Sequence, residues 1–316
     1  MNREKINRKL SRLPTNLVII IILIIWLIPT VGLLVTSFRP LQDINTTGWW
    51  TVFSPRAEEA GPRFTFNNYI DAIVGYRGTK TYAAECATGT SVTYNCNISD
   101  VLNPRGMGRA FLNSLIVTIP AVILPILFAT FAAYAFSWME FKGRMILFAI
   151  LVGLQVVPLQ MTLVPVLRMF VTLKMNGTFW GVWLFHTGFG LPYAIYLMRN
   201  YIGGLPKDLF ESAFLDGAST WTAFVKLVIP LAMPAIASLV IFQFLWVWND
   251  LLVALVFLGG TKPVMTYQIS NMVTSLGSGW HLLTAAAFLS MILPMIIFFG
   301  LQKYFVRGML AGSVKG

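Results

Sequence analysis

The chain has 316 residues, of which 57% are hydrophobic and only 11% are charged. Soluble domains carry about 25% charged residues, so this composition excludes an ordinary soluble globular protein and predicts a polytopic membrane protein. The net charge of +11 does not indicate nucleic-acid binding, because the sequence has no basic patch interleaved with aromatic residues.

The chain begins with a basic tail, residues 1–16, which is followed by an apolar run at residues 17–38. A cleaved signal peptide has a similar order of segments. However, this apolar run is longer than the core of a signal peptide, and no cleavage site of the small-x-small type follows it. We therefore predict a retained first transmembrane helix.

Five further segments have the roughly 20 apolar residues that a bilayer-spanning helix needs. The fifth of these six spans is taken to begin after Pro230 and Pro234, which interrupt the uncharged run before it. Spanning strands of alternating polarity are absent, so helices are the expected structure. The sequence thus predicts an all-α polytopic membrane protein with six transmembrane helices, the last five at residues 109–137, 145–168, 179–199, 236–258 and 283–304.

A long insertion, residues 39–108, separates the first two helices and is rich in Gly, Thr, Asn and aromatic residues. Its composition allows either a small folded module or a lid. The chain's two cysteines, Cys86 and Cys96, both lie in it. In an oxidising compartment they are candidates for a disulfide, and two free thiols are the alternative.

The distribution of Lys and Arg predicts the orientation. With the N-terminus in the cytoplasm, 11 of the 23 Lys and Arg residues fall in the inner segments, while the short outer loops hold only Lys174 and Lys262. The long loop 39–108 is basic too, but long loops are translocated largely regardless of their charge. The insertion 39–108 is then extracytoplasmic, and both termini are cytoplasmic. The inner segments are residues 1–16, 138–144, 200–235 and the C-terminal tail 305–316.

Several predicted helices within the core, residues 109–304, contain proline. Proline lacks an N–H group and leaves a helical carbonyl without its partner. Two interpretations remain open: the prolines set packing geometry, or they let the helices bend to open a path. The residues are Pro120, Pro125, Pro158, Pro165, Pro192 and Pro294.

Residues 205–235 interrupt the hydrophobic core with charged side chains. Pro206 suits the first turn of a helix, Gly217 permits a turn, and Ser219 or Thr220 can cap a second helix that would end at Pro230 and Pro234. We predict two short cytoplasmic helices. They either lie on the membrane surface or dock a soluble partner, and the acidic residues near the turn disfavour an anionic lipid surface.

The spacing of residues in this loop is distinctive. Glu211, Ser212 and Ala213 are followed by Gly217 after three residues, and Leu227, Ile229 and Pro230 come after nine more. The pattern resembles the EAA loop of bacterial ABC-importer permeases, Glu-Ala-Ala, Gly and Ile-x-Leu-Pro. Ser212, Leu227 and Ile229 depart from it by small or apolar exchanges. The stretches NSLIVT at 113–118, FQFLWVWNDLLVALVF at 242–257 and the ending YFVRGMLAGSVKG are similar to the second membrane subunit of maltose and α-glucoside importers.

The resemblance implies a permease subunit of an ATP-driven importer in the bacterial inner membrane, for an α-glucoside or oligosaccharide such as maltose or trehalose. The implied partners are a second permease subunit, an ATPase dimer and an extracytoplasmic sugar-binding protein. ATP and Mg²⁺ would be bound by the ATPase, since this chain has no Gly-x-x-x-x-Gly-Lys-Ser/Thr loop. No catalytic residue, metal site or cofactor is expected. The implied coupling residues are Glu211, Ser212, Ala213, Asp216, Gly217, Leu227, Ile229 and Pro230.

Candidate substrate contacts lie on the fifth predicted helix, where aromatic and polar residues recur every three or four positions. An acid within a membrane segment is a functional candidate. The alternatives are that Asp250 lies at the outer rim or pairs with Arg168, and that Trp246 belongs to the interfacial aromatic belt. For His186 the alternative is a packing role. The residues on the common face are Phe242, Trp246, Asn249, Asp250 and Val253, and Gln243, His186 and Tyr193 complete the candidates for the pathway.

Other functions fit less well. An ion channel or secondary transporter needs charges within the membrane and has no use for the loop at 205–235. An intramembrane protease needs paired catalytic residues that this sequence lacks. An ABC permease for amino acids or peptides is the main alternative to a sugar permease.

Overall fold

The computed structural model describes residues 13–55, 62–75, 101–272 and 279–311. All regular structure in these residues is helical, as the sequence predicts. Cys86 and Cys96 lie outside the described residues, so their pairing stays a prediction.

The helices divide into two compact units, each described here by itself. The first comprises Met1–Met107 and Ile269–Leu289, and the second comprises Gly108–Gln268 and Ser290–Gly316. The long helix α15 (Trp280–Ala311) contributes to both.

The first unit contains α2 (Leu13–Ser37), α3 (Leu41–Thr46), the 3₁₀ helix η1 (Trp49–Phe53) and α4 (Asn67–Val74). The apolar side chains of α2 are exposed along almost its whole length, and only 6% of its most apolar stretch is buried within the chain. An isolated helix with apolar residues on all sides fits a lipid environment rather than water.

Four helices of the described chain are long and apolar enough to cross a membrane: Pro14–Ser37, Met107–Trp138, Thr220–Trp248 and Trp280–Lys303. A strongly bent pair, α7 and α8, would be a fifth span if it crosses as one. Helix α9 (Phe179–Ile202) is not among them, although its 24 residues have the required length. The structure therefore supports a membrane-spanning helical protein and leaves the number of six spans a prediction.

The third predicted span, residues 145–168, is not one straight helix. The chain forms α7 (Arg144–Leu154) and α8 (Leu159–Thr172), whose axes differ by 98°. Pro158 at the junction cannot donate a backbone hydrogen bond, and it restricts the residue before it to extended conformations. The hydrophobic pattern is the same for a bent and a straight pair, and so it did not reveal the bend.

The fifth predicted span, residues 236–258, has different limits. Helix α12 runs from Ile229 to Trp248. It contains Pro230 and Pro234, which were expected to lie before the span and to end the preceding loop helix. Pro230 lies in the first turn, where its missing N–H group has little cost, and Pro234 is accommodated inside the helix. A π-helical turn, η4 (Phe224–Val228), joins α12 to α11 (Thr220–Ala223).

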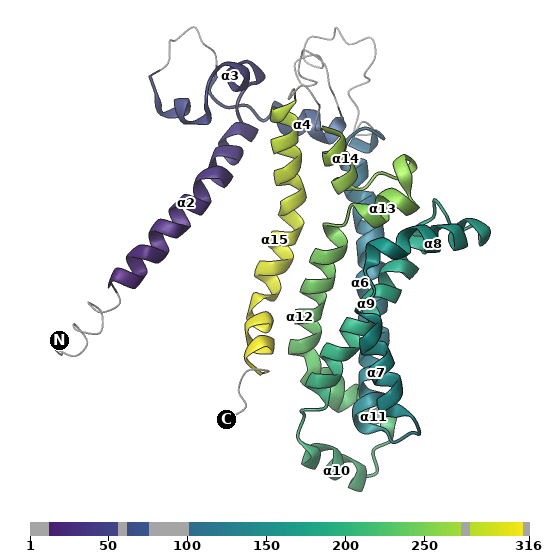
Figure 1. The fold of residues 1–316 in the computed structure, drawn as a ribbon. Coiled ribbons are helices and arrows are strands. Elements are labelled where there is room, and N and C mark those ends of the chain that lie inside the picture. Colours follow the sequence, from purple (N-terminus) through teal and green to yellow (C-terminus); the bar gives the residue numbers. More distant parts are fainter. Residues whose placement is uncertain (1–12, 56–61, 76–100, 273–278, 312–316) are drawn as a thin grey trace, which may run out of the picture. The chain divides into compact units, whose positions relative to one another are not determined.

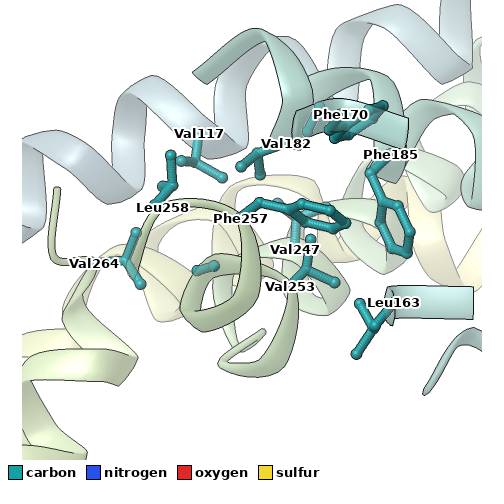
Figure 2. Packing of buried hydrophobic residues seen from close by; sticks show 12 residues of the cluster. Val117, Leu163, Phe170, Val182, Phe185, Val247, Val253, Phe257, Leu258 and Val264 are labelled. Atoms are coloured by element: carbon teal, nitrogen blue, oxygen red, sulfur yellow. The ribbon is translucent and has the colours of Figure 1, made fainter. Parts of the chain in front are cut away.

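At its other end α12 stops at Trp248, and a separate short helix, α13 (Leu252–Phe257), follows after a break. In Figure 1, α6 (Met107–Trp138), α9 and α12 run side by side, and α13 lies beside α8. Figure 2 shows the apolar cluster that packs around α13. This packing fixes α13 and the break before it. The labelled members are Val117, Leu163, Phe170, Val182, Phe185, Val247, Val253, Phe257, Leu258 and Val264.

Three helical prolines have their freed carbonyls satisfied by side chains of neighbouring helices. A proline at position i removes the hydrogen bond to the carbonyl of residue i−4. These contacts favour the packing interpretation for Pro120, Pro125 and Pro294. The bonds run from Trp183 Nε1 to the Ile116 oxygen (2.8 Å), from Gln243 Nε2 to the Ala121 oxygen (3.1 Å) and from Trp248 Nε1 to the Ser290 oxygen (3.0 Å).

Candidate coupling and substrate sites

The loop between α9 and α12 contains α10 (Lys207–Leu215), a turn at Gly217, and α11. Gly217 has φ of +84°, in the left-handed region that favours glycine, so the predicted turn is confirmed. Ser219 caps α11, and its Oγ accepts a hydrogen bond from the Thr222 amide at 3.2 Å. The second helix, however, continues through η4 into α12 instead of ending at the prolines.

Aromatic side chains connect α10 and the start of α11 to the ends of α6 and α9. Phe210 is 1% exposed and stacks on Trp138, with ring centroids 3.8 Å apart and an interplanar angle of 21°. Trp138 Nε1 donates to the Ile202 carbonyl at 3.1 Å, and Tyr134 Oη donates to the Thr220 carbonyl at 3.3 Å. These contacts join α10 to the end of α6, and the end of α6 to α9 and α11. The apolar spacing of Leu209, Phe210, Ala213, Phe214 and Ala218 predicts a buried stripe that includes Phe210. Sequence analysis did not single out Tyr134 and Trp138, whose only signal was the aromatic composition of residues 131–138.

The tip of the loop is exposed and partly apolar. Glu211, Ser212, Asp216 and Gly217 are exposed, and Leu215 is 88% exposed. A Cβ built at Gly217 meets no atom within 4 Å. In Figure 1, α10 lies at one end of the second unit. A surface of this kind, with apolar side chains beside acidic ones, suits contact with another protein.

The remaining members of the predicted motif are Ala213 on α10 and three residues at and just before the start of α12. Ala213 is half-buried, Leu227 and Ile229 are also half-buried, and Pro230 is exposed at the start of α12. The motif thus combines exposed residues on α10 with residues that join the loop to α12.

Comparisons with known proteins agree with this geometry. Residues 110–311 match the family described as the binding-protein-dependent transport system inner membrane component. The chain belongs to this family. The chain is therefore a membrane transport subunit rather than an enzyme, and the resemblance to ABC-importer permeases is confirmed.

Individual relatives of this permease cover nearly the whole chain. The chain is 54% identical to the osmoprotective compounds uptake permease protein GgtD of Synechocystis sp., over 98% of this chain and 95% of that one. It is 41% identical to the alpha-glucoside transport system permease protein AglG of Rhizobium meliloti, over 95% and 96%. A bacterial ABC transporter that imports the acidic polysaccharide alginate has the same fold, with a TM-score of 0.63, 18% identity and coverage of 96% and 99%.

The permease has a second group of polar residues at the end of α12 opposite the loop. Asp250 follows the end of α12, and its Oδ2 accepts hydrogen bonds from the amides of Val253 (3.0 Å) and Ala254 (3.2 Å), so it caps α13. Thr266 Oγ1 donates to the Asp250 backbone carbonyl at 2.7 Å. The same carboxylate oxygen, Oδ2, lies 3.9 Å from His186 Nε2, so the neighbouring side chain of Asp250 is His186 and not Arg168.

His186 is 1% exposed, whereas the Asp250 side chain is 13% exposed. His186 Nδ1 lies 3.1 Å from the Val182 carbonyl, which can only accept, so Nδ1 carries a proton. Nε2 has no hydrogen-bond partner in the described part of the chain. The Trp246 ring stands edge-on to the imidazole, with centroids 5.3 Å apart. His186, Trp246 and Asp250 therefore form one group, the α12-end cluster.

Two other candidate pathway residues, Gln243 and Asn249, have hydrogen-bond partners outside this cluster. Gln243 is buried, and its Nε2 donates a hydrogen bond to the Ala121 carbonyl that Pro125 frees. It also packs closely on Gly190, where an added Cβ would lie 2.7 Å from Gln243 Nε2. Asn249 is exposed and donates to the Leu245 carbonyl at 2.8 Å.

Tyr193 lies elsewhere on α9, where it lines a hollow of about 360 Å³ between α9 and the bend after α7. The common helical face that the sequence predicted is wrong beyond Trp248: Asn249 and Asp250 follow the end of α12, and Val253 belongs to α13 and is fully buried. Periodicity could not foresee this, because the helix ends at Trp248.

Proposed function

We propose that this permease is one of two membrane subunits of an ATP-driven importer for small neutral α-glucosides, a class that includes maltose and trehalose. Its partners are a second permease subunit, an ATPase dimer and an extracytoplasmic sugar-binding protein. The coupling part of this proposal rests on one observation: α10 and the turn after it are exposed at Glu211, Leu215 and Gly217, while the buried Phe210 of α10 stacks on Trp138 of α6. The names of relatives with 54% and 41% identity, for osmoprotective compounds and alpha-glucosides, support the substrate class.

In this proposal the ATPase binds α10 and the turn after it, at Glu211, Asp216 and Gly217. Closure of the ATPase moves α10, and the Phe210–Trp138 stack passes the displacement to α6 and α9. The π-helical turn gives the loop a second connection, directly into α12. Turns of this kind are frequent at functional sites in helices.

The α12-end cluster is the proposed place of substrate contact. The buried His186 imidazole lies behind this site, with Nε2 3.9 Å from an Asp250 carboxylate oxygen. The partly exposed Asp250 carboxylate can accept a hydrogen bond from a sugar hydroxyl, and the exposed Trp246 ring offers an apolar face beside it. A zwitterionic amino acid would also need a cationic group for its carboxylate, and the described contacts of Asp250 include no Lys or Arg side chain.

The orientation belongs to the same proposal. The loop at 205–235 and both termini face the cytoplasm, where the ATPase is, while residues 39–108 face the binding protein. The bias of Lys and Arg toward the inner segments supports this arrangement.

Uptake by the complete transporter tests the proposal. The four components are reconstituted in vesicles with ATP, and uptake of labelled trehalose or maltose is measured in competition with other α-glucosides and with amino acids. We expect ATP-dependent uptake that α-glucosides inhibit and amino acids do not. Inhibition by amino acids alone would assign the importer to the other substrate class, and vesicles without ATP serve as the control.

A further inference from the structure

The chain beyond α2 turns back along the helix. Arg39, two residues after the helix end at Ser37, is only 3% exposed. Its guanidinium donates to the carbonyls of Asp43 (3.0 Å) and Thr47 (3.1 Å), to the Thr47 hydroxyl, and to Thr51 Oγ1 at 3.3 Å. A buried guanidinium requires such acceptors. Arg39 thus fixes α3 and η1 to the end of α2.

The contact between Trp49 and Gly32 shows how far η1 returns along the helix. A Cβ added at Gly32 would lie 2.7 Å from Trp49 Nε1 and 2.9 Å from Cε2, so the indole lies directly against the helix backbone. Gly32 precedes Ser37 by five residues, which is about 7.5 Å along the helix axis. The helix η1 therefore lies beside the last turn and a half of α2, not beyond its end.

This position corresponds to the boundary of a bilayer. With 25 residues, α2 is about 37 Å long, whereas the hydrocarbon core is about 30 Å thick. The first charged residue after the helix is Arg39. The last turns of α2, and η1 beside them, thus fall where acyl chains meet headgroups.

The side chains near this position are those that the boundary favours. Trp50 and Phe53 of η1 are 63% and 78% exposed. Phe64 and Phe66, which precede α4, are 53% and 70% exposed, and the ring of Phe66 contacts Phe38 at the end of α2, with centroids 5.4 Å apart. The segment Gly48–Phe53 contains no charged residue. Aromatic side chains concentrate at membrane interfaces because one part of the ring is buried while the edge stays hydrated.

We propose that η1 is a membrane-surface anchor whose Trp50 and Phe53 insert between lipid headgroups next to α2, with Phe64 and Phe66 extending the same surface. Lipid is the occupant because this surface continues the exposed apolar surface of α2 at the end of a helix long enough to cross a bilayer. The anchor holds the beginning of the insertion 39–108 at a fixed depth. The inference does not depend on the transported solute or on which side of the membrane η1 lies.

Site-directed spin labelling in the complete transporter tests this inference. In a Cys86→Ser, Cys96→Ser background, a nitroxide is placed at Phe53→Cys and, as the control, at the exposed Gln42→Cys of α3. The complex is reconstituted in phosphatidylcholine vesicles containing anionic lipid. We expect the label at 53 to collide more with oxygen, which concentrates in lipid, than with a water-soluble nickel chelate, and the label at 42 to show the reverse preference.

A second variant links the result to the contact with α2. Gly32→Val displaces Trp49, and it should increase the nickel accessibility at position 53, whereas Leu33→Val should not. Equal nickel accessibility at positions 53 and 42 in the absence of the binding protein would overturn the inference. Protection at position 53 that appears only when the binding protein is added would also overturn it, because the surface would then belong to a protein contact.

Discussion

Gly217 is the residue on which the shape of the loop depends most directly. Left-handed backbone costs an ordinary residue roughly 1–2 kcal/mol, whereas Asn tolerates it. The space around the Gly217 Cβ position is open within this chain, so a side chain there meets no atom of the permease. We expect Gly217→Val to reduce transport-coupled ATP hydrolysis by roughly tenfold, because about 1.4 kcal/mol corresponds to a factor of ten, while the variant still inserts and assembles.

Gly217→Asn separates the two possible causes. If only the backbone conformation matters, the ATPase activity of the Asn variant stays close to that of the wild type. If the ATPase surface leaves no room for a side chain at position 217, both variants lose coupling. Normal transport by the Val variant would contradict a coupling role for this residue.

Asp250 has two roles in our proposal, as the cap of α13 and as a substrate contact. Asn caps helices about as well as Asp, whereas Ala costs about 1 kcal/mol. We therefore expect Asp250→Asn to keep the thermal stability of the complex and Asp250→Ala to lower it. Hydrogen bonds to charged groups contribute about 1.5–3 kcal/mol, so uptake at low sugar concentration should fall tenfold or more in both variants. Normal uptake by the Asn variant would leave Asp250 with a structural role alone.

The helices α6 and α12 are joined through the carbonyl that Pro125 frees. Gln243→Met keeps the length of the side chain but leaves the buried Ala121 oxygen without a donor, which costs about 1–3 kcal/mol. The purified complex should therefore unfold at a lower temperature. Pro125→Ala restores the backbone N–H that bonds this oxygen in a regular helix, so the double variant should regain stability.

Pro234→Ala is the matched control for this rescue. Pro234 lies inside α12, and the carbonyl four residues before it belongs to Pro230 and not to Ala121. Combined with Gln243→Met, it should not restore the unfolding temperature. Equal rescue by both proline substitutions would mean that the stability gain comes from helix propensity and not from this hydrogen bond.

In the whole transporter the loop and the α12-end cluster lie at opposite ends of α12. This helix has 20 residues, so the two sites are about 30 Å apart, and coupling between them requires α12, α6 and α9 to move as packed bodies. The exposed Leu215 should meet the ATPase, whereas Met161 on α8, which is 74% exposed, should not. In the cysteine-free complex, Leu215→Cys should crosslink to the ATPase subunit, and Met161→Cys should not. The same crosslinking yield at both positions would contradict docking at α10.

The sequence by itself predicted the class of the protein, because hydrophobicity over 20 residues and the EAA spacing are local properties. It placed α2, α6 and α15 within a few residues at most ends. It also placed the turn at Gly217 and limited the cap to Ser219 or Thr220, because these depend on the conformational preferences of single residues. Candidate coupling residues followed from a motif at fixed spacing, and their roles remain predictions.

How each proline acts depends on tertiary contacts that the sequence does not show. Pro158 joins two helices at a sharp bend, whereas Pro230 and Pro234 lie within α12. A proline inside a helix is tolerated where the lost hydrogen bond is replaced, and for Pro125 the replacement comes from Gln243, more than a hundred positions away in sequence. The contacts of His186 with Asp250 and of Trp49 with Gly32 could not be predicted either. The sequence shows which side chains a helix carries but not which residues of other elements they will contact.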